Sequence, residues 1–92
     1  MAKQLRITGL VQGVGYRYNF HAQARALNLT GWVRNRLDGS VEASVSGSDP
    51  ALEKIVEWAR RGPPGARVTE VLIAETDDTP KPQGEFEIWP TA

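Results

Sequence analysis

The apolar residues of this 92-residue chain change their spacing four times in a fixed order, and that order most limits the possible fold. Alternation of apolar and polar residues, typical of strands, occurs in four segments, residues 4–11, 30–36, 41–46 and 67–76. Spacing near 3.6, typical of amphipathic helices, occurs in two, residues 18–28 and 50–61. A polar loop at 77–84 and a short fifth strand at 84–89 are expected to follow.

Residues with restricted backbone preferences mark the ends of these segments. Asn28 is expected to end the first helix in the left-handed conformation. Asp38-Gly39 predicts a tight hairpin turn between the second and third strands, because glycine accepts a positive φ there. Asp49 is expected to cap the second helix, with Pro50 at its first helical position. The chain therefore has the order β-α-β-β-α-β, followed by a terminal strand.

This order predicts an α+β fold in which two β-α-β units are joined by a hairpin, the ferredoxin-like split βαβ sandwich. Because crossover connections are right-handed, both helices should cover one face of an antiparallel sheet. The four main strands are expected in the order 4-1-3-2. The first and second strands are then parallel, and their C-terminal ends lie at the same edge of the sheet. The length suits a single domain spanning residues 1–92.

The composition excludes several classes of function. The chain has no cysteine and one histidine, which excludes a disulfide scaffold, a cysteine nucleophile and a metal site of thiolates or of several histidines. We expect neither a metal nor another cofactor. We interpret His21 as a partly exposed surface residue in preference to a phosphoryl carrier. The N-terminus has no apolar signal region, and no run approaches the ~18 apolar residues of a membrane helix, so we expect a cytoplasmic protein without membrane contact.

The net charge of zero is the sum of two oppositely charged halves. Residues 1–37 contain no acid, whereas residues 38–92 contain five basic residues and all eleven acids. The basic residues of the first half are Lys3, Arg6, Arg17, Arg25, Arg34 and Arg36. This sorting predicts an anion-binding region in the N-terminal part, with chance sorting on a solvated surface as the alternative.

A glycine-bearing segment joins the first strand to the first helix, with the sequence Gln12-Gly13-Val14-Gly15-Tyr16-Arg17. Backbone N–H groups at a helix N-terminus have no partner within the helix, and the helix dipole adds positive potential. The two glycines allow the backbone to curl around a tetrahedral anion. The fork of Arg17 can hold two phosphate oxygens. These features indicate a phosphate cradle, with a tight turn and an exposed arginine as the alternative.

Asn35 stands near the C-terminal end of the second strand. The first and second strands should be separated by two strand spacings, about 10 Å, so side chains pointing inward could close around a phosphoryl group and one water. An amide carries both a donor and an acceptor and can orient a water by two hydrogen bonds. The alternative is a turn residue that bonds its own backbone. Arg34 and Arg36 should point to the opposite side of this strand.

Two separated motifs of the chain resemble the signatures of the acylphosphatase family. The first is Gly9-Leu10-Val11-Gln12-Gly13-Val14-Gly15-Tyr16-Arg17, and the second is Gly31-Trp32-Val33-Arg34-Asn35 followed by Gly39. The resemblance extends over essentially the whole chain. It departs at Tyr16, where the family usually has phenylalanine. The added hydroxyl needs water or a protein partner.

The resemblance implies an enzyme that hydrolyses the carboxyl–phosphate bond of small acyl phosphates without a cofactor. Arg17 matches the family's phosphate-binding residue, and Asn35 matches the residue that positions the attacking water. The backbone N–H groups that match the anion cradle belong to Gly13, Val14, Gly15, Tyr16 and Arg17. The resemblance also implies a monomer whose partners are acyl phosphates, phosphate or other small anions, with no nucleic acid.

Two alternatives remain open. One is an acylphosphatase-like domain that is not catalytic or that handles carbamoyl phosphate, as found within larger hydrogenase-maturation proteins. The other is a ferredoxin-like module that binds nucleic acid, which the basic N-terminal half would suit. The expected third strand lacks the aromatic residues of such modules, which disfavours the second alternative.

Overall fold

The structure, a computed structural model, describes residues 2–76 and 86–92. Its helices and strands follow the predicted order and are β1 (Ala2–Leu10), α1 (Tyr16–Ala26), β2 (Thr30–Asn35), β3 (Val41–Ser46), α2 (Asp49–Arg61), β4 (Arg67–Thr76) and β5 (Phe86–Ile88). The polar loop predicted at residues 77–84 and the first two residues of the predicted fifth strand lie outside the described residues.

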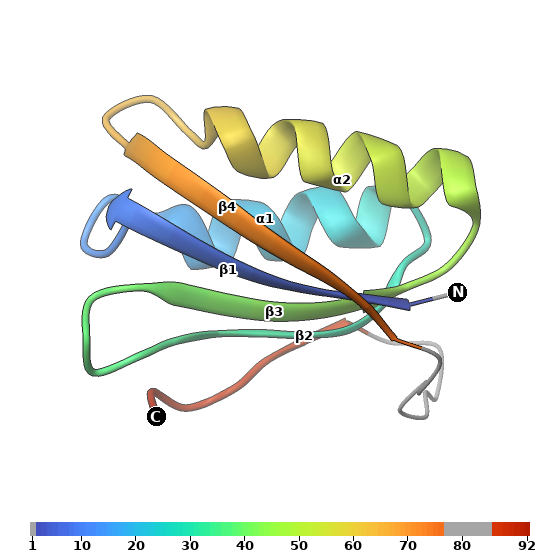
Figure 1. The fold of residues 1–92 in the computed structure, drawn as a ribbon, viewed down its shortest axis with the longest axis horizontal. Helices are drawn as coiled ribbons and strands as arrows, with labels where there is room; N and C mark the ends of the chain where they lie inside the picture. Colours follow the sequence, from blue (N-terminus) through green and yellow to red (C-terminus); the bar gives the residue numbers. More distant parts are fainter. Residues whose placement is uncertain (1, 77–85) are drawn as a thin grey trace.

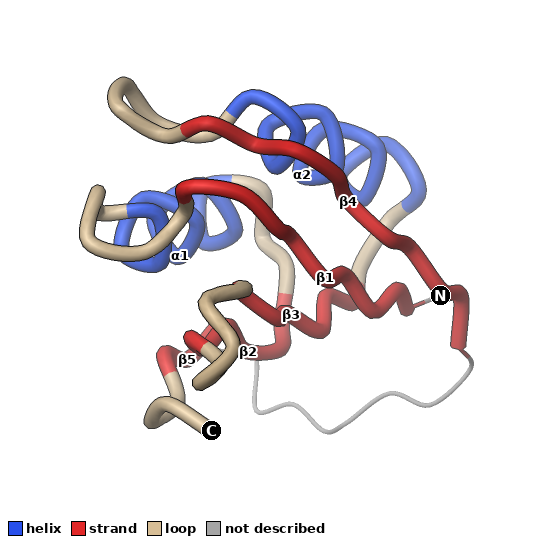
Figure 2. Tube along the Cα trace, turned by 60° about the vertical axis from the view of Figure 1, so that its left-hand side comes forward, coloured by secondary structure: helices blue, strands red, loops and turns tan. Residues whose placement is uncertain are grey.

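The strands form one sheet in the order β4-β1-β3-β2-β5, and both helices cover the same face (Figures 1 and 2). The four main strands have antiparallel neighbours in the predicted order 4-1-3-2. The fifth strand makes the sheet mixed, because β5 pairs in parallel with the outer edge of β2. Beyond β5 the pairing continues, since Ala92 N donates to Asn35 O at 3.0 Å. The expectation of a wholly antiparallel sheet therefore holds for four strands and fails for the fifth.

The register places the C-terminal ends of β1 and β2 at the same end of the sheet. Val41, at the start of β3, pairs with Ile7 on one side and with Asn35 on the other. Because β3 lies between β1 and β2, two strand spacings, about 10 Å, separate these two strands. The β1–α1 loop and the β2–β3 turn lie at this same end of the molecule (Figure 1).

The hydrophobic core lies between the sheet and the two helices. Apolar side chains with almost no exposure fill it, among them Leu5, Ile7, Phe20, Val33, Leu52 and Ile55. A group of aromatic rings anchors the start of α1, because Tyr16 lies 5.2 Å from Trp58 and 6.2 Å from Phe20 between ring centroids. Burial of these rings fixes α1, and with it the loop that precedes the helix.

Both helices begin at residues other than those predicted. Helix α1 begins at Tyr16, not at residue 18, because Gly15 takes a left-handed conformation (φ 79°) and serves as the N-cap. Helix α2 is capped by Ser48, not by Asp49, because Ser48 Oγ accepts the N–H of Ala51 at 3.3 Å. The left-handed residue predicted after α1 is confirmed at Asn28, with φ 59°.

The hydroxyl of Tyr16 has a protein partner. Tyr16 is 1% exposed, and its hydroxyl donates to the carbonyl oxygen of Ala59 at 2.8 Å. In an α-helix the N–H four residues later would fill that carbonyl, but that residue is Pro63, which has no N–H. Burial raises the pKa of Tyr16, so the hydroxyl stays protonated and remains a donor. The departure from the usual phenylalanine thus satisfies a carbonyl that the proline leaves open.

We expect Tyr16→Phe to lower the free energy of unfolding by about 1–2 kcal/mol, because a buried carbonyl loses its donor. Urea unfolding of both proteins measures this difference. Tyr18→Phe is the matched control and should change stability by less than about 0.5 kcal/mol, since Tyr18 is 65% exposed. Equal stability of parent and Tyr16→Phe would mean that the buried bond contributes nothing.

Candidate active site

The loop between β1 and α1 has the backbone conformation that an anion cradle needs. Gly13 and Gly15 both have φ 79°, in the left-handed region that residues with a Cβ rarely adopt. A Cβ at Gly13 would meet no atom within 4 Å, so the requirement for glycine there comes from the backbone angle and not from crowding. Left-handed residues in such a loop allow successive backbone N–H groups to face one side, where they can bind an anion.

The N-terminus of α1 remains open to an anion. Within residues 2–76 and 86–92, no side chain accepts a hydrogen bond from its first N–H groups, and no acidic residue stands in its first turn. The free N–H groups and the dipole of the helix therefore create positive potential at the end of the loop.

A pocket of about 120 Å³ lies at this helix end and brings the two predicted side chains together. Arg17 enters it from α1 and Asn35 from the end of β2. Its lining residues are Val11, Gln12, Gly13, Gly15, Tyr16, Arg17, Tyr18 and Asn35. Of the predicted cradle residues, Val14 alone does not line the pocket, because its side chain packs against the hydrophobic core.

Arg17 has no acidic partner among the described residues. Its guanidinium carbon lies 5.4 Å from the centroid of the Tyr18 ring, a cation–π contact that leaves the N–H groups available. Four of the other five basic residues in the N-terminal half form ion pairs with acids of the second half: Lys3, Arg6, Arg34 and Arg36. The charge sorting seen in the sequence is thus largely neutralised by pairing, and the pocket keeps an unpaired cation.

Asn35 presents a free side-chain amide. It shares a face of β2 with buried Val33, which is the face that the helices cover. Its backbone is fixed by pairing with Val41 and by the bond from Ala92, but its side chain makes no hydrogen bond among the described residues. The amide can therefore bind a ligand or a water in the pocket.

The sequence left open whether the side chain of Asn35 bonds its own backbone in the turn after β2. In the structure the side chain that forms this turn is that of Asp38. One Asp38 carboxylate oxygen accepts the hydroxyl of Ser40 at 2.6 Å and the backbone N–H of Ser40 at 2.9 Å. These hydrogen bonds hold the pKa of Asp38 below its usual value. The turn is therefore complete without the side chain of Asn35.

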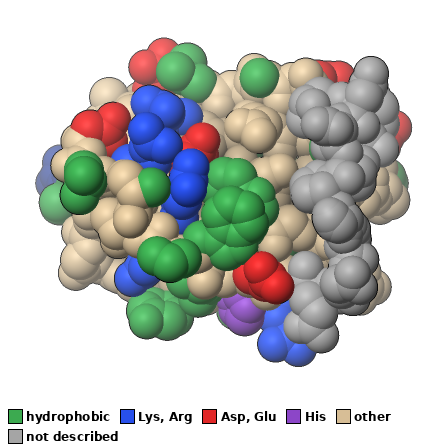
Figure 3. Space-filling view, turned by 90° about the horizontal axis from the view of Figure 1, so that it is seen from below, with side chains coloured by type: hydrophobic (Ala, Val, Ile, Leu, Met, Phe, Trp, Pro, Cys, Tyr) green, Lys and Arg blue, Asp and Glu red, His purple; other side chains and the backbone are tan. Residues whose placement is uncertain are grey.

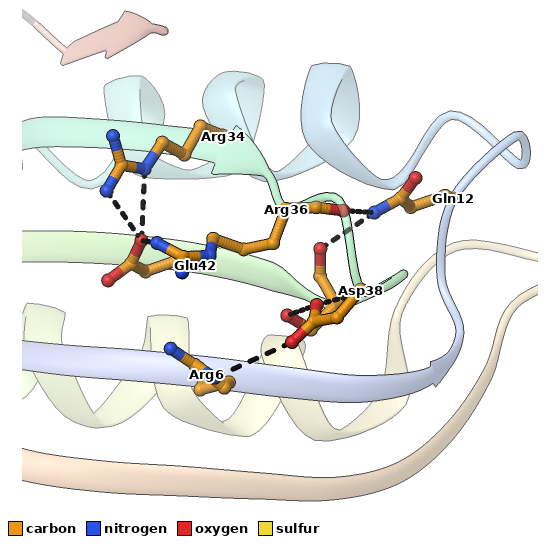
Figure 4. A network of polar contacts seen from close by, with 7 residues as sticks. Arg6, Gln12, Arg34, Arg36, Asp38 and Glu42 are labelled. Atoms are coloured by element: carbon orange, nitrogen blue, oxygen red, sulfur yellow. Dashed lines mark hydrogen bonds and ion pairs between the residues drawn. The ribbon is translucent and has the colours of Figure 1, made fainter. Parts of the chain in front are cut away.

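The outer face of the sheet carries the arginines that flank Asn35. Arg34 and Arg36 both bond one carboxylate oxygen of Glu42, at 3.0 and 3.1 Å (Figure 4). Their position opposite Asn35 is the one that the alternation along the strand predicted. On the same face the indole rings of Trp32 and Trp89 stack at 4.3 Å between centroids. Figure 3, seen from below, shows basic side chains beside acidic and hydrophobic ones. These residues lie outside the pocket.

His21 takes a structural position. Its Nε2 lies 2.9 Å from the carbonyl oxygen of Phe86, so the ring links α1 to β5. It does not line the pocket, and it is partly buried. The partial exposure agrees with the interpretation of His21 from the sequence.

Sequence reasoning did not single out the side chains of Gln12 and Tyr18 as parts of the pocket. Tyr18 follows Arg17 directly, is exposed and lines the pocket. The signal that could have found them is their position in the sequence, since both residues flank the predicted cradle.

In the two described ranges no group of three or more potential metal ligands comes together. The helices found there are all too short or too polar to cross a membrane.

The fold and the pocket define a ferredoxin-like α+β protein with a small polar site at one end of its sheet. The acylphosphatase family model matches residues 3–88. Over 75 residues the chain is 53% identical to the acylphosphatase of Acidovorax sp. (strain JS42), covering 82% of this chain and 77% of that protein. The chain belongs to the acylphosphatase family.

Solved structures agree with this assignment. The crystal structure of acylphosphatase from Bacillus subtilis matches with a TM-score of 0.91 at 35% identity, covering 96% of this chain and 97% of that one. Full-length HypF in its phosphate- and nucleotide-bound form matches with a TM-score of 0.87 at 28% identity. That match covers 98% of this chain but 12% of HypF, so the same fold also occurs as a small part of a larger protein.

Proposed function

We propose that this acylphosphatase hydrolyses small acyl phosphates in the pocket between the β1–α1 loop and the end of β2. One observation carries the proposal: a single pocket joins an arginine, a helix N-terminus and a side-chain amide, none of which is bonded by a side chain of the part of the chain that the structure describes. This combination suits an anion and a water molecule held side by side.

The phosphoryl group binds at the loop. The backbone N–H groups of residues 13–17 surround its oxygens, and the guanidinium of Arg17 holds two of them. The donors are fixed before the substrate arrives, because the two glycines set the loop and the aromatic core holds the start of α1. Fixed donors stabilise the charge that develops on the phosphoryl oxygens during transfer.

Asn35 holds the water that attacks phosphorus. The new bond forms between the water oxygen and phosphorus while the bond from phosphorus to the acyl oxygen breaks. A carboxylate leaves, and inorganic phosphate remains. The carboxylate is a good leaving group, so positioning and charge stabilisation supply most of the catalysis.

The proton of the water passes to the substrate itself. None of the pocket-lining residues that the structure describes is Asp, Glu or His. A general base from the protein is thus missing from the wall, and the phosphate or carboxylate oxygens of the substrate accept the proton.

We propose further that the chain acts as a single domain over residues 1–92, as a monomer in the cytoplasm and without a cofactor, with acyl phosphates and small anions as its partners. Among the solved structures, 35% identity to the acylphosphatase of Bacillus subtilis over 97% of that chain, against 28% identity to 12% of HypF, supports the free enzyme over a domain of a larger protein. On the outer face of the sheet the two tryptophans stack on each other, which disfavours a platform for nucleic-acid bases.

Phosphate release from acetyl phosphate and benzoyl phosphate tests the proposal. Both should be hydrolysed with a kcat/KM at least about 100-fold above that for p-nitrophenyl phosphate, whose leaving group is poorer. In ¹⁸O-labelled water the label should enter inorganic phosphate, because water attacks phosphorus. A folded protein without activity, or label in the carboxylate, would contradict the mechanism.

A further inference from the structure

Gln12 connects the loop of the pocket to the neighbouring hairpin. It directly precedes Gly13, and its side-chain nitrogen donates to the carbonyl oxygens of both Arg36 and Ser40, each at 2.8 Å (Figure 4). The side chain is partly buried and also lines the pocket. Both hydrogens of its amide nitrogen are therefore used on the turn between β2 and β3.

The two carbonyls that Gln12 bonds are those that close this turn. Ser40 O also accepts the N–H of Arg36 at 2.8 Å, and Arg36 O also accepts the N–H of Gly39 at 3.0 Å. Each oxygen thus has two donors, one from the hairpin and one from Gln12. A neutral planar nitrogen with two hydrogens can serve both oxygens, whereas a carboxylate or an apolar side chain of equal length can serve neither.

This contact is placed where the two halves of the pocket meet. The loop leaves the end of β1, and Asn35 ends β2, with the start of β3 between them. Among the hydrogen bonds of the described residues, those of Gln12 are the ones that join residues 11–15 to residues 35–41. Arg36, one of the two acceptors, follows Asn35 directly in the chain.

We propose that Gln12 is a positioning residue, which fixes the distance between the phosphate cradle and the amide of Asn35. The inference rests on the proposed function, because the distance matters for a water that must attack a bound phosphoryl group in line. A misplacement of about 1 Å can reduce such a rate about 100-fold. Phosphate binding alone needs the loop and Arg17, and it does not depend on this distance.

Gln12→Met tests the proposal, since methionine keeps the length and neutrality of the side chain but cannot donate. We expect kcat for benzoyl phosphate to fall about 10- to 100-fold, while the inhibition constant of inorganic phosphate changes less than about threefold. Gln23→Met makes the same exchange at an exposed position of α1 and should retain the parent values. Circular dichroism and urea unfolding show whether each variant is folded.

A second comparison separates positioning from a general loss of loop structure. Because Gln12 acts through Asn35, Gln12→Met should lower kcat less than about twofold further when Asn35→Ala is already present. An equal loss in both backgrounds, an unchanged kcat in Gln12→Met, or a parallel loss of phosphate binding would each overturn the inference. Should Gln12→Met not fold, Gln12→Asn, whose amide is one methylene too short to reach both carbonyls, is held to the same outcomes.

The activity of the parent protein distinguishes a failure of the proposed function from a failure of the positioning role of Gln12. An inactive but folded parent contradicts the proposed function. An active parent whose Asn35→Ala variant is impaired, together with a fully active Gln12→Met variant, contradicts the role of Gln12 alone.

Discussion

Arg17→Ala is expected to lower kcat/KM for benzoyl phosphate about 1000-fold. The guanidinium is a charge in the pocket without an acidic partner among the described residues. In the proposed mechanism it offers two N–H groups to one phosphoryl group. Loss of one fixed donor to a developing oxyanion typically reduces a rate about 100- to 1000-fold, and here a charged donor pair is lost. Inhibition by inorganic phosphate should weaken in the same variant, because the product uses the same donors.

Two further variants make this result specific. Arg25→Ala removes another arginine of α1, exposed and also without an acidic partner among the described residues, and should leave kcat/KM within about twofold. Arg17→Lys keeps the charge but loses the planar fork, so it should recover only part of the activity. The assignment of Arg17 is wrong if Arg17→Ala is folded and retains the parent kcat/KM.

Asn35→Ala is expected to lower kcat about 100- to 1000-fold with little change in phosphate binding. In the proposed mechanism the amide orients the water, so its loss affects the transition state more than the bound ground state. The inhibition constant of inorganic phosphate should therefore stay within about threefold of the parent value. Steady-state kinetics with benzoyl phosphate, with phosphate as inhibitor, measures both quantities.

The stability of Asn35→Ala serves as its control. The backbone of Asn35 pairs with Val41 and accepts the N–H of Ala92, and the substitution removes neither bond. The free energy of unfolding should change by less than about 1 kcal/mol. A variant that binds phosphate poorly but keeps its kcat would show that Asn35 holds the substrate and not the water.

Most of the fold was predictable because each element carries its own periodicity and crossover handedness then fixes the strand order. The partner of β5 was not predictable in this way, because three residues such as Phe86–Ile88 can pair with either free edge. The start of α2 was missed for a local reason. Ser48 and Asp49 can both cap a helix, and only the geometry shows that Ser48 Oγ accepts the N–H of Ala51.

The candidate site was predictable in its main parts. Arg17 and Asn35 were expected to meet because the strands before them end at one edge, and the pocket does bring them together. The contacts of Gln12 could not be expected, because its acceptors are backbone carbonyls whose positions depend on the register of the β2–β3 hairpin. The partner of the Tyr16 hydroxyl could not be predicted either, since it depends on how α1 packs against α2.

The ends of the described chain differ in how an attachment there would affect the enzyme. Ala2 starts β1 at the end of the sheet far from the pocket, whereas Ala92 is hydrogen-bonded to Asn35 and Leu37 beside it (Figure 1). An affinity tag, a fluorescent dye or a link to a solid support is therefore best joined before β1. The same groups joined after Ala92 would follow a residue whose backbone is bonded to Asn35, which lines the pocket.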